Sequence, residues 1–246
     1  MTIQLCTPTG GTITEGYVKS LFRIMAAFKG KHVVNWCTWS GGDIYVARNF
    51  CLIPPAPELG PAVKLFAERK PWNGKVEYDR ILWVDSDVTF SPADVENIIG
   101  HDVDVCTGLV KRDFNVFALK FYGKLDSGLS AMADVVEYAR GEDGEAINGF
   151  DEFLKLRDER GLVEVGGCGG AFLCIKRGVY EAIPYPWYRT RNLRQIEKDE
   201  EGKDFLAAEL DLTEDLGFSE TLKEAGFRIW ADPMVRPTHE KRIGLR

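Results

Sequence analysis

The sequence predicts an α/β protein with a mostly parallel central sheet flanked by helices and a smaller antiparallel second half. Short apolar strand patterns alternate with helical patterns through the first 110 residues, as they do in doubly wound sheets. The later glycine-rich segments instead favour hairpins. A chain of 246 residues can form one large α/β domain, and no linker or internal repeat divides it. We therefore expect a single domain over 1–246, with halves at 1–110 and 111–246.

The composition is that of a soluble protein with a sizeable core, with 45% hydrophobic and 28% charged residues. A net charge of −7 argues against a nucleic-acid groove or an anionic membrane as the main partner. No segment approaches the ~20 apolar residues of a transmembrane helix. Pro8 and Gly10 interrupt the chain before a signal-peptide core could form. Six cysteines without a CxxC pair are expected to be buried free thiols, so the sequence predicts a cytoplasmic protein.

The first half of the chain contains two strand–helix units. An apolar strand over 3–7 stops at "PTGG", and a second strand covers 32–39. Asp43 is a suitable N-cap for the helix that follows the second strand. Five apolar residues are expected on one face of the first helix: Val18, Leu21, Phe22, Met25 and Phe28.

The most informative stretch is "ILWVDSDVTF", residues 81–90, in which an apolar strand ends in two carboxylates. Ser91 then begins a helix as its N-cap, so the strand turns directly into a helix. Strand alternation directs Asp85 and Asp87 to the same side. Ligands of open α/β sheets bind outside the carboxyl ends of the strands, where this pair lies.

The second half begins with a strand at 103–110 and a hairpin partner at 116–123. The glycine-rich segment 161–177 is expected to form two strands hinged at glycines. The segment 188–204 is densely charged and nearly free of apolar residues, so we expect an exposed, mobile loop.

The helix over 214–226 has Thr213 as its expected N-cap. On this helix Asp215 shares a face with Phe218 and Leu222, and that face packs inward. Glu214 is turned about 100° away from it. The pattern therefore carries Asp215 toward the interior, although both acids could also simply complement the helix dipole.

Three interpretations of the aspartate pair remain open from the residues themselves. The pair could be ordinary turn chemistry, with one carboxylate capping and the other solvated. "DSDVT" also resembles the first motif of haloacid-dehalogenase phosphatases, with Asp85 as nucleophile and Asp87 as general acid. That motif normally lies near the start of its domain, whereas more than 80 residues precede it here.

The third interpretation depends on the order of several motifs. These are "CTPTGG", "VARNFCL", "LWVDSDV", "EVGGCGGAFLCIKR" and "LTEDLGFSETLKEAGFRIWADP". In this order they resemble the GT-A glycosyltransferases over nearly the whole chain, most closely family 2-like enzymes and small virus-encoded domains. The acceptor-side motifs of processive synthases are absent. If the chain is virus-encoded, its cytoplasmic location would be the host's.

The resemblance implies a metal-dependent hexosyltransferase using a UDP- or GDP-type sugar donor and a glycan or other hydroxyl acceptor. It implies that Asp87, with Asp85, holds Mn²⁺ or Mg²⁺, and that Asp85 reaches the ribose or a metal-bound water. His239 follows the last expected strand and could add an imidazole, which Mn²⁺ accepts more readily than Mg²⁺. A solvated histidine is the alternative. Asp215 is implied as the base that accepts the acceptor proton, with inversion at the anomeric carbon.

The resemblance further implies a nucleotide-binding half at 1–110 and an acceptor and catalytic half at 111–246. The implied donor contacts come from Thr7, Pro8, Thr9, Arg48, Asp85, Ser86, Gly169 and Gly170.

Several roles stay open at this point. Asp43 or Asp79 could instead contact the nucleotide base, and Trp187 and Tyr188 could stack on a sugar or anchor the core. The segment 188–204 could close over the donor as a lid. A nucleotide- or sugar-binding module without turnover would carry the same motifs.

Overall fold

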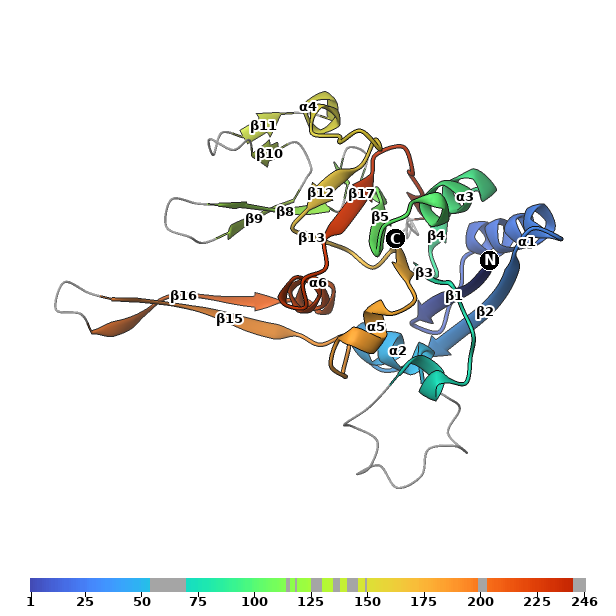
Figure 1. Cartoon of the computed structure of the whole chain (residues 1–246), viewed down its shortest axis with the longest axis horizontal. Helices are drawn as coiled ribbons and strands as arrows, with labels where there is room; N and C mark the ends of the chain where they lie inside the picture. Colours follow the sequence, from blue (N-terminus) through green and yellow to red (C-terminus); the bar gives the residue numbers. More distant parts are fainter. Residues whose placement is uncertain are drawn as a thin grey trace, which may run out of the picture.

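The computed structural model describes residues 1–53, 70–113, 116–117, 119–124, 130–134, 138–140, 146–148, 150–198 and 203–240. Its centre is one seven-stranded sheet, from which a two-stranded arm projects (Figure 1). The strands in spatial order are β12 (Val163–Val165), β17 (Ile229–Asp232), β5 (Val105–Gly108), β14 (Phe172–Lys176), β3 (Arg80–Val84), β1 (Thr2–Thr9) and β2 (Val33–Ser40).

Most of this sheet is parallel in direction. β1 pairs in parallel with both β2 and β3, and β5 pairs in parallel with β17. β14 runs antiparallel between β3 and β5, and β12 runs antiparallel to β17. Five of the seven strands therefore share one direction, which confirms the predicted α/β class with a mostly parallel sheet.

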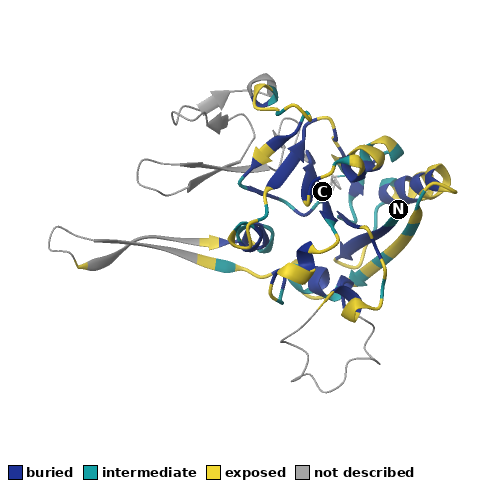
Figure 2. Ribbon diagram, in the orientation of Figure 1, coloured by how far each residue is buried: buried dark blue, intermediate teal, exposed yellow. Residues whose placement is uncertain are grey.

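Both faces of the sheet are covered by helices. The helices are α1 (Glu15–Phe28), α2 (Ile44–Cys51), the 3₁₀ helix η3 (Pro71–Gly74), α3 (Pro92–Gly100), α4 (Phe150–Lys155), α5 (Val179–Ala182) and α6 (Glu214–Glu224). On β3, Ile81 and Trp83 belong to one apolar cluster and Leu82 and Val84 to the other, as strand alternation requires. Side chains of α1 and α3 complete one cluster, and side chains of α2, α5 and α6 complete the other. Figure 2 shows the resulting buried body.

Smaller antiparallel elements lie mostly in the second half, as predicted. They are β4 (Val88–Thr89) with β18 (Thr238–His239), β6 (Lys111–Asp113) with β7 (Val116–Phe117), β8 (Leu119–Lys124) with β9 (Ser130–Asp134) and β13 (Gly167–Cys168), β10 (Tyr138–Arg140) with β11 (Ala146–Asn148), and β15 (Arg191–Lys198) with β16 (Asp204–Leu212).

The loop predicted over 188–204 is instead largely strand. β15 and β16 pair antiparallel from Arg191↔Leu212 to Lys198↔Asp204 and form the projecting arm of Figure 1. The register sets Leu193 opposite Leu210 and Arg194 opposite Glu209. This pairing joins two segments of the chain, so it becomes visible only once the partner strand is known. The expectation of a loop was therefore wrong.

Two expectations about the N-terminal unit also need correction. The first strand continues through Thr9, because it pairs with β2 up to Thr9↔Ser40. Pro8 fits there because β1 pairs with β3 only up to Cys6, so past that point one side of the strand is unpaired. On α1 the buried face is Tyr17, Ser20, Leu21, Ile24 and Phe28, whereas Val18, Phe22 and Met25 are exposed.

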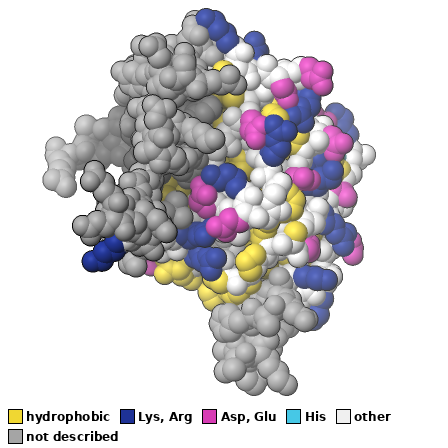
Figure 3. All heavy atoms as spheres, turned by 60° about the vertical axis from the view of Figure 1, so that its left-hand side comes forward, with side chains coloured by type: hydrophobic (Ala, Val, Ile, Leu, Met, Phe, Trp, Pro, Cys, Tyr) yellow, Lys and Arg dark blue, Asp and Glu magenta, His cyan; other side chains and the backbone are white. Residues whose placement is uncertain are grey.

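None of the described helices has the length and apolar character needed to cross a lipid bilayer. On the face seen in Figure 3, acidic and basic side chains of the described residues are interspersed.

Candidate active site

The turn Asp85–Ser86–Asp87 is held by backbone hydrogen bonds to three separate parts of the chain. The Asp85 amide donates to Ala171 O at 3.1 Å, Thr14 N donates to Ser86 O at 2.9 Å, and Glu240 N donates to Asp87 O at 2.7 Å. The turn follows β3 at the edge where the parallel neighbours β1 and β2 also end. The aspartate pair therefore lies just past the carboxyl end of β3, as the sequence predicted.

Arg48 of α2 lies at the centre of the site with only 1% of its side chain exposed. Its Nη2 donates to Asp85 Oδ1 at 3.1 Å and its Nη1 donates to Gly170 O at 3.1 Å. Its Nε lies 3.4 Å from Asp215 Oδ1. The guanidinium also lies 5.6 Å from the ring centroids of both Trp83 and Tyr188. Arg48 thus joins two carboxylates from distant segments inside an aromatic enclosure.

Gly170 explains how the guanidinium fits against the backbone. A Cβ at this position would lie 2.5 Å from Arg48 Cζ, well inside van der Waals contact. The group that lies against the backbone at Gly170 is thus Arg48, and the donor contacts implied for Gly169 and Gly170 stay a prediction. Gly169 is partly exposed beside it.

Asp215 reaches this cluster from the first turn of α6. Phe218 and Leu222 on the same face are buried, as expected, and Thr213 occupies the N-cap position. The Asp215 side chain is 22% exposed, yet its Oδ1 is buried and has no hydrogen-bond partner. Glu214 is half-buried, and burial together with the charge of Asp215 raises its pKa.

The carboxyl group of Asp85 is partly buried close to Arg48 and to two other carboxylates. Burial raises the pKa of Asp85, the charge of Arg48 opposes that rise, and the charges of Asp215 and Asp87 add to it. Three carboxylates, those of Asp85, Asp215 and Glu214, lie in the field of the Arg48 guanidinium, and Asp87 adds a fourth negative charge beside Asp85. The described part of the site is short of positive charge.

His239 lies beside the other aspartate of the turn. Antiparallel pairing of β18 with β4 sets His239 opposite Val88, and His239 Nε2 is 3.7 Å from Asp87 Oδ1. That separation is too long for a hydrogen bond, and among the residues that the structure describes the buried Nε2 has no hydrogen-bond partner. Among the residues that the structure describes, no three His, Cys, Asp or Glu side chains are grouped closely enough to form a metal centre. The three residues predicted to hold the metal, Asp85, Asp87 and His239, thus lie close together but are not arranged as a set of metal ligands.

Glu240, which the sequence analysis did not select, fixes the strand that carries His239. Its Oε1 accepts from Thr89 Oγ1 at 2.6 Å, and its carboxylate also bonds to the Thr14 side chain and the Gly16 amide at the start of α1. Hydrogen bonding to Thr89 is the first cause of a lowered pKa for Glu240. A Cβ at Gly16 would overlap this carboxylate, so the glycine leaves room for it.

The predicted nucleotide loop is less accessible than expected. Thr7 is fully buried, its hydroxyl hydrogen-bonds to Tyr17, and it accepts from Trp36 Nε1 at 3.1 Å. Pro8 is buried too. The Thr9 hydroxyl donates to Thr12 O at 2.9 Å and accepts from Gly11 N at 3.0 Å, which shapes the following turn.

The remaining candidate residues lie at different places in the structure. Asp79 accepts from Thr2 N at 2.6 Å, at the opposite end of β3 from the aspartate pair. Asp43 is exposed at the start of α2 and makes no side-chain cap bond. Trp187 and Tyr188 are fully buried, so they are core anchors.

Asn49 and Tyr188 are further site residues whose roles the sequence did not reveal. Asn49 Nδ2 donates to Tyr188 O at 2.7 Å, and Tyr188 N donates to Asn49 Oδ1 at 3.2 Å. Asn49 therefore fixes the aromatic residue that packs on Arg48. Asn49 follows Arg48 in "ARN", and Tyr188 was expected to stack on a sugar or to anchor the core, but neither pattern shows that Asn49 and Tyr188 bond to each other.

No family model and no curated protein matches the chain. Among solved structures, the chain is similar to A197 from STIV, with 18% identity, a TM-score of 0.47, and coverage of 98% of this chain and 87% of that one. It is also similar to a putative UDP-N-acetylglucosamine pyrophosphorylase from Entamoeba histolytica, with 11% identity, a TM-score of 0.37, and coverage of 98% and 74%.

Proposed function

We propose that this chain is a GT-A type glycosyltransferase that moves a sugar from a nucleotide-diphosphate donor to an acceptor hydroxyl with the help of a divalent cation. The observation that carries the proposal is the convergence of Asp85, Asp87, His239 and Asp215 around Arg48 at one edge of the sheet. These residues come from four separate parts of the chain, so turn chemistry alone does not account for their meeting.

The charge balance of the site supports a cation. Three carboxylates lie in the field of Arg48 and Asp87 adds a fourth charge beside Asp85, and like-charge repulsion contributes to the raised pKa of both Asp85 and Glu214. A divalent ion would relieve that repulsion. It would also neutralise the diphosphate leaving group, which is the chemistry it supplies to the reaction.

Asp87 and His239 are the residues that would hold the cation. Two donor atoms that each lie about 2.1 Å from one ion can be at most about 4.2 Å apart. Asp87 Oδ1 and His239 Nε2 are 3.7 Å apart, and the histidine nitrogen is buried without a partner. A carboxylate with an imidazole suits Mn²⁺ better than Mg²⁺. Asp85 would contact the cation through water or bind the ribose.

Asp215 is proposed as the general base. Its side chain is 22% exposed and its Oδ1 has no hydrogen-bond partner among the described residues, so the carboxylate can accept the proton of the acceptor hydroxyl. Arg48 Nε, 3.4 Å from Asp215 Oδ1, holds the side chain in place at the start of α6. With the base opposite the leaving group, attack by the acceptor oxygen inverts the anomeric carbon.

Asp43 is the better of the two candidates for reading the nucleotide base, because Asp79 is engaged at the far end of its strand. We propose UDP or GDP as the nucleotide. A phosphatase would need Asp85 free for attack on phosphorus, but its Oδ1 is hydrogen-bonded to Arg48.

A thermal-shift panel of UDP, GDP, dTDP and CMP, each with and without Mn²⁺, tests the binding part of the proposal. One nucleotide should raise the Tm only with Mn²⁺, with a shift that follows the logarithm of ligand over Kd. Asp87→Ala should remove the shift. If no nucleotide acts with Mn²⁺, or if Asp87→Ala responds like the parent, the proposed cation site is wrong.

Turnover is tested separately with the Asp215→Asn variant. This variant should bind nucleotide and Mn²⁺ like the parent while donor-sugar transfer or hydrolysis falls by about 10³-fold or more. If the parent binds nucleotide but turns over no donor, the chain is a binding module instead.

A further inference from the structure

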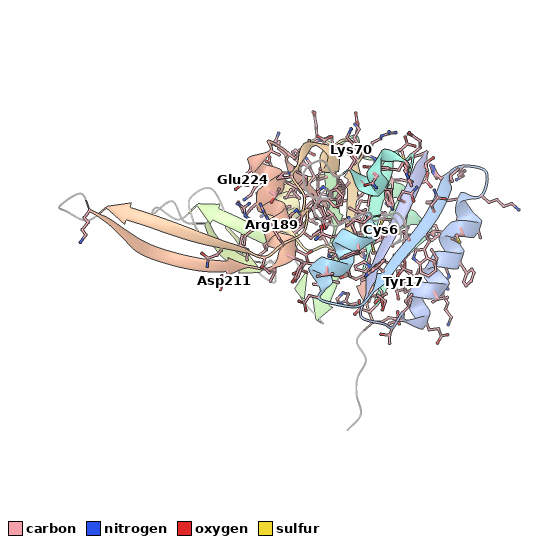
Figure 4. All side chains as sticks on the ribbon, turned by 90° about the horizontal axis from the view of Figure 1, so that it is seen from below. Cys6, Tyr17, Lys70, Arg189, Asp211 and Glu224 are labelled. Atoms are coloured by element: carbon pink, nitrogen blue, oxygen red, sulfur yellow. The ribbon has the colours of Figure 1, made fainter. Side chains whose placement is uncertain are left out.

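Three of the six cysteines lie together on the face of the sheet that α2 covers. They are Cys6 on β1, Cys37 on β2 and Cys51 at the end of α2. Cys6 and Cys37 are register partners on neighbouring strands, and Cys37 Sγ donates to Cys51 O at 3.0 Å. Cys37 therefore lies next to both of the other cysteines. Figure 4 marks Cys6 within the body, away from the arm.

The three thiols differ in access and in ionisation. β2 is an edge strand, so Cys37 is only partly buried, whereas Cys6 and Cys51 are buried. Hydrogen bonds from Cys51 and then from Cys6 lower the pKa of Cys37. The same bond to Cys37 and burial raise the pKa of Cys51. The most accessible thiol is therefore also the one whose thiolate is best stabilised, which is the combination that reacts with oxidants.

We propose that Cys37 and Cys51 form an oxidisable thiol pair that takes hydroperoxides as its substrate class. The Cys37 thiolate attacks one peroxide oxygen, the O–O bond breaks, and hydroxide leaves with a proton as water. The Cys37 sulfenic acid is then attacked by the Cys51 sulfur, which loses its proton, and the S–O bond breaks to release a second water. With hydrogen peroxide, two thiols are oxidised to one disulfide and the peroxide is reduced to two waters. With an organic hydroperoxide, an alcohol leaves in place of the first water.

Cys51 is the resolving partner in preference to Cys6 because of their positions. β1 is paired on both sides, with β2 and with β3, so the Cys6 backbone is fixed within the sheet. Cys51 is the last residue of α2, where the helix turns into Leu52, and helix ends adjust more easily than central strands. A disulfide requires a specific separation of its Cα and Cβ atoms, so this freedom decides which bond can close.

The chain contains a matched control pair. Cys106 and Cys174 are also register partners, on β5 and β14, and both are buried. Burial raises the pKa of each. They share the proximity of the proposed pair without its access or its stabilised thiolate.

Oxidation is measured on the folded protein with hydrogen peroxide, followed by alkylation, digestion after Lys and Arg, and mass spectrometry without reduction. Cys6, Cys37 and Cys51 fall on separate peptides because Lys19, Lys31 and Arg48 lie between them. Free thiol should disappear from Cys37 and Cys51 at least about ten times faster than from Cys106 and Cys174, with a Cys37–Cys51 cross-link. In urea, this difference should vanish.

Variants assign the two roles, with a thermal melt to confirm that each is folded. Cys51→Ser should leave Cys37 as a sulfenic acid that dimedone traps, and Cys6→Ser should leave the cross-link intact. A cross-link from Cys37 to Cys6 would overturn the assignment of Cys51. Equal oxidation of the control pair, or an unreacted Cys37 in the folded parent, would overturn the proposal itself.

Discussion

The two sides of the charged cluster are built differently. On one side, Arg48 is buried, donates to Asp85 and Gly170, and packs between Trp83 and Tyr188. On the other side, Asp87 and His239 face each other at 3.7 Å without a hydrogen bond. The first side is held by the hydrogen bonds of Arg48, and its two buried atoms without a hydrogen bond, Arg48 Nε and Asp215 Oδ1, lie 3.4 Å from each other. On the second side no hydrogen bond joins Asp87 and His239, and the buried His239 Nε2 has no hydrogen-bond partner among the described residues.

From this difference we infer that the two sides of the cluster have different roles. A buried polar atom without a partner costs free energy, and a folded chain tolerates that cost most readily where a ligand will supply the partner. The Arg48 side therefore fixes the positions of Asp85 and Asp215, and the His239 side is where we propose that the cation binds. Variants on the first side should mainly change stability, and variants on the second should mainly change ligand binding.

The largest expected effect is that of Arg48→Ala. Removing the guanidinium leaves Asp85 and Asp215 as carboxylates with no cation between them and empties the space beside Trp83. We expect the free energy of unfolding to fall by about 3 kcal/mol in urea titrations. Arg48→Lys should recover little, because an ammonium cannot make the same set of bonds while packed between two rings.

Arg23, exposed on α1, provides the matched control for this change. Arg23→Ala should alter unfolding by no more than about 0.5 kcal/mol. If Arg48→Ala is as mild as that, the Arg48 side is not structural.

Gly170→Ala should produce the next largest effect. Its Cβ would lie 2.5–2.7 Å from three guanidinium atoms, so Arg48 must move and its bond to Asp85 must weaken. We expect a loss of about 2 kcal/mol in the same titration. Gly100→Ala at the end of α3 has no atom within 4 Å of its Cβ and should be neutral. Equal behaviour of the two variants would contradict the proposed packing.

The sequence was sufficient to predict the elements that depend on local pattern. The α/β class, the strand ending at Asp85 and Asp87, the capped α3, and the inward direction of Asp215 all follow from periodicity and capping. It did not predict the arm, because β15 has few apolar residues and its pairing with β16 is not visible in its own pattern. Periodicity within one segment carries no information about its partner strand.

The interior of the site was also beyond the sequence. Arg48 was expected to contact the nucleotide, but it lies 1% exposed among protein groups, because Gly170 gives it access to a carbonyl 122 positions away in the chain. Thr7 was expected on a loop and is buried under Tyr17. Contacts between distant segments decide both outcomes, and one sequence without its structure does not show them.

After Arg48→Ala and Gly170→Ala, the next largest effect should appear in cation binding and not in the free energy of unfolding. His239→Ala should weaken Mn²⁺-dependent nucleotide binding, measured by calorimetry, by more than tenfold, as is roughly typical of ligand shells. Glu240→Ala should weaken it by about tenfold, because Glu240 fixes the strand that carries His239. Gly16→Ala should have a similar effect, since its Cβ would displace the Glu240 carboxylate without removing it.

A double-mutant cycle tests whether Glu240 acts through His239. In the His239→Ala background, Glu240→Ala should have no further effect on binding. Glu15→Gln, a neighbouring acid on the exposed start of α1, serves as the control and should leave binding unchanged. An undiminished Glu240→Ala effect without the imidazole would mean that Glu240 does not position it.

The smallest effect is a pH dependence that reports on Asp85. Burial raises its folded-state pKa above 3.8, so folding stabilises the protonated form of Asp85 relative to the unfolded chain. Its contribution to stability is complete below pH 3.8 and is lost as the pH rises through the folded pKa. The unfolding free energy of the parent minus that of Asp85→Asn should therefore decline across this window.

Asp102 should show the opposite dependence of stability on pH, because its hydrogen bond to Lys176 lowers its pKa. The contribution of Asp102 should be present above pH 3.8 and should be lost as the pH falls through its lowered folded value. Adding Mn²⁺ with the preferred nucleotide should flatten the Asp85 profile, because a cation beside Asp87 stabilises the ionised form of Asp85. It should leave the Asp102 profile unchanged. If both profiles respond alike, the cation acts on the whole protein and not at the turn between β3 and β4.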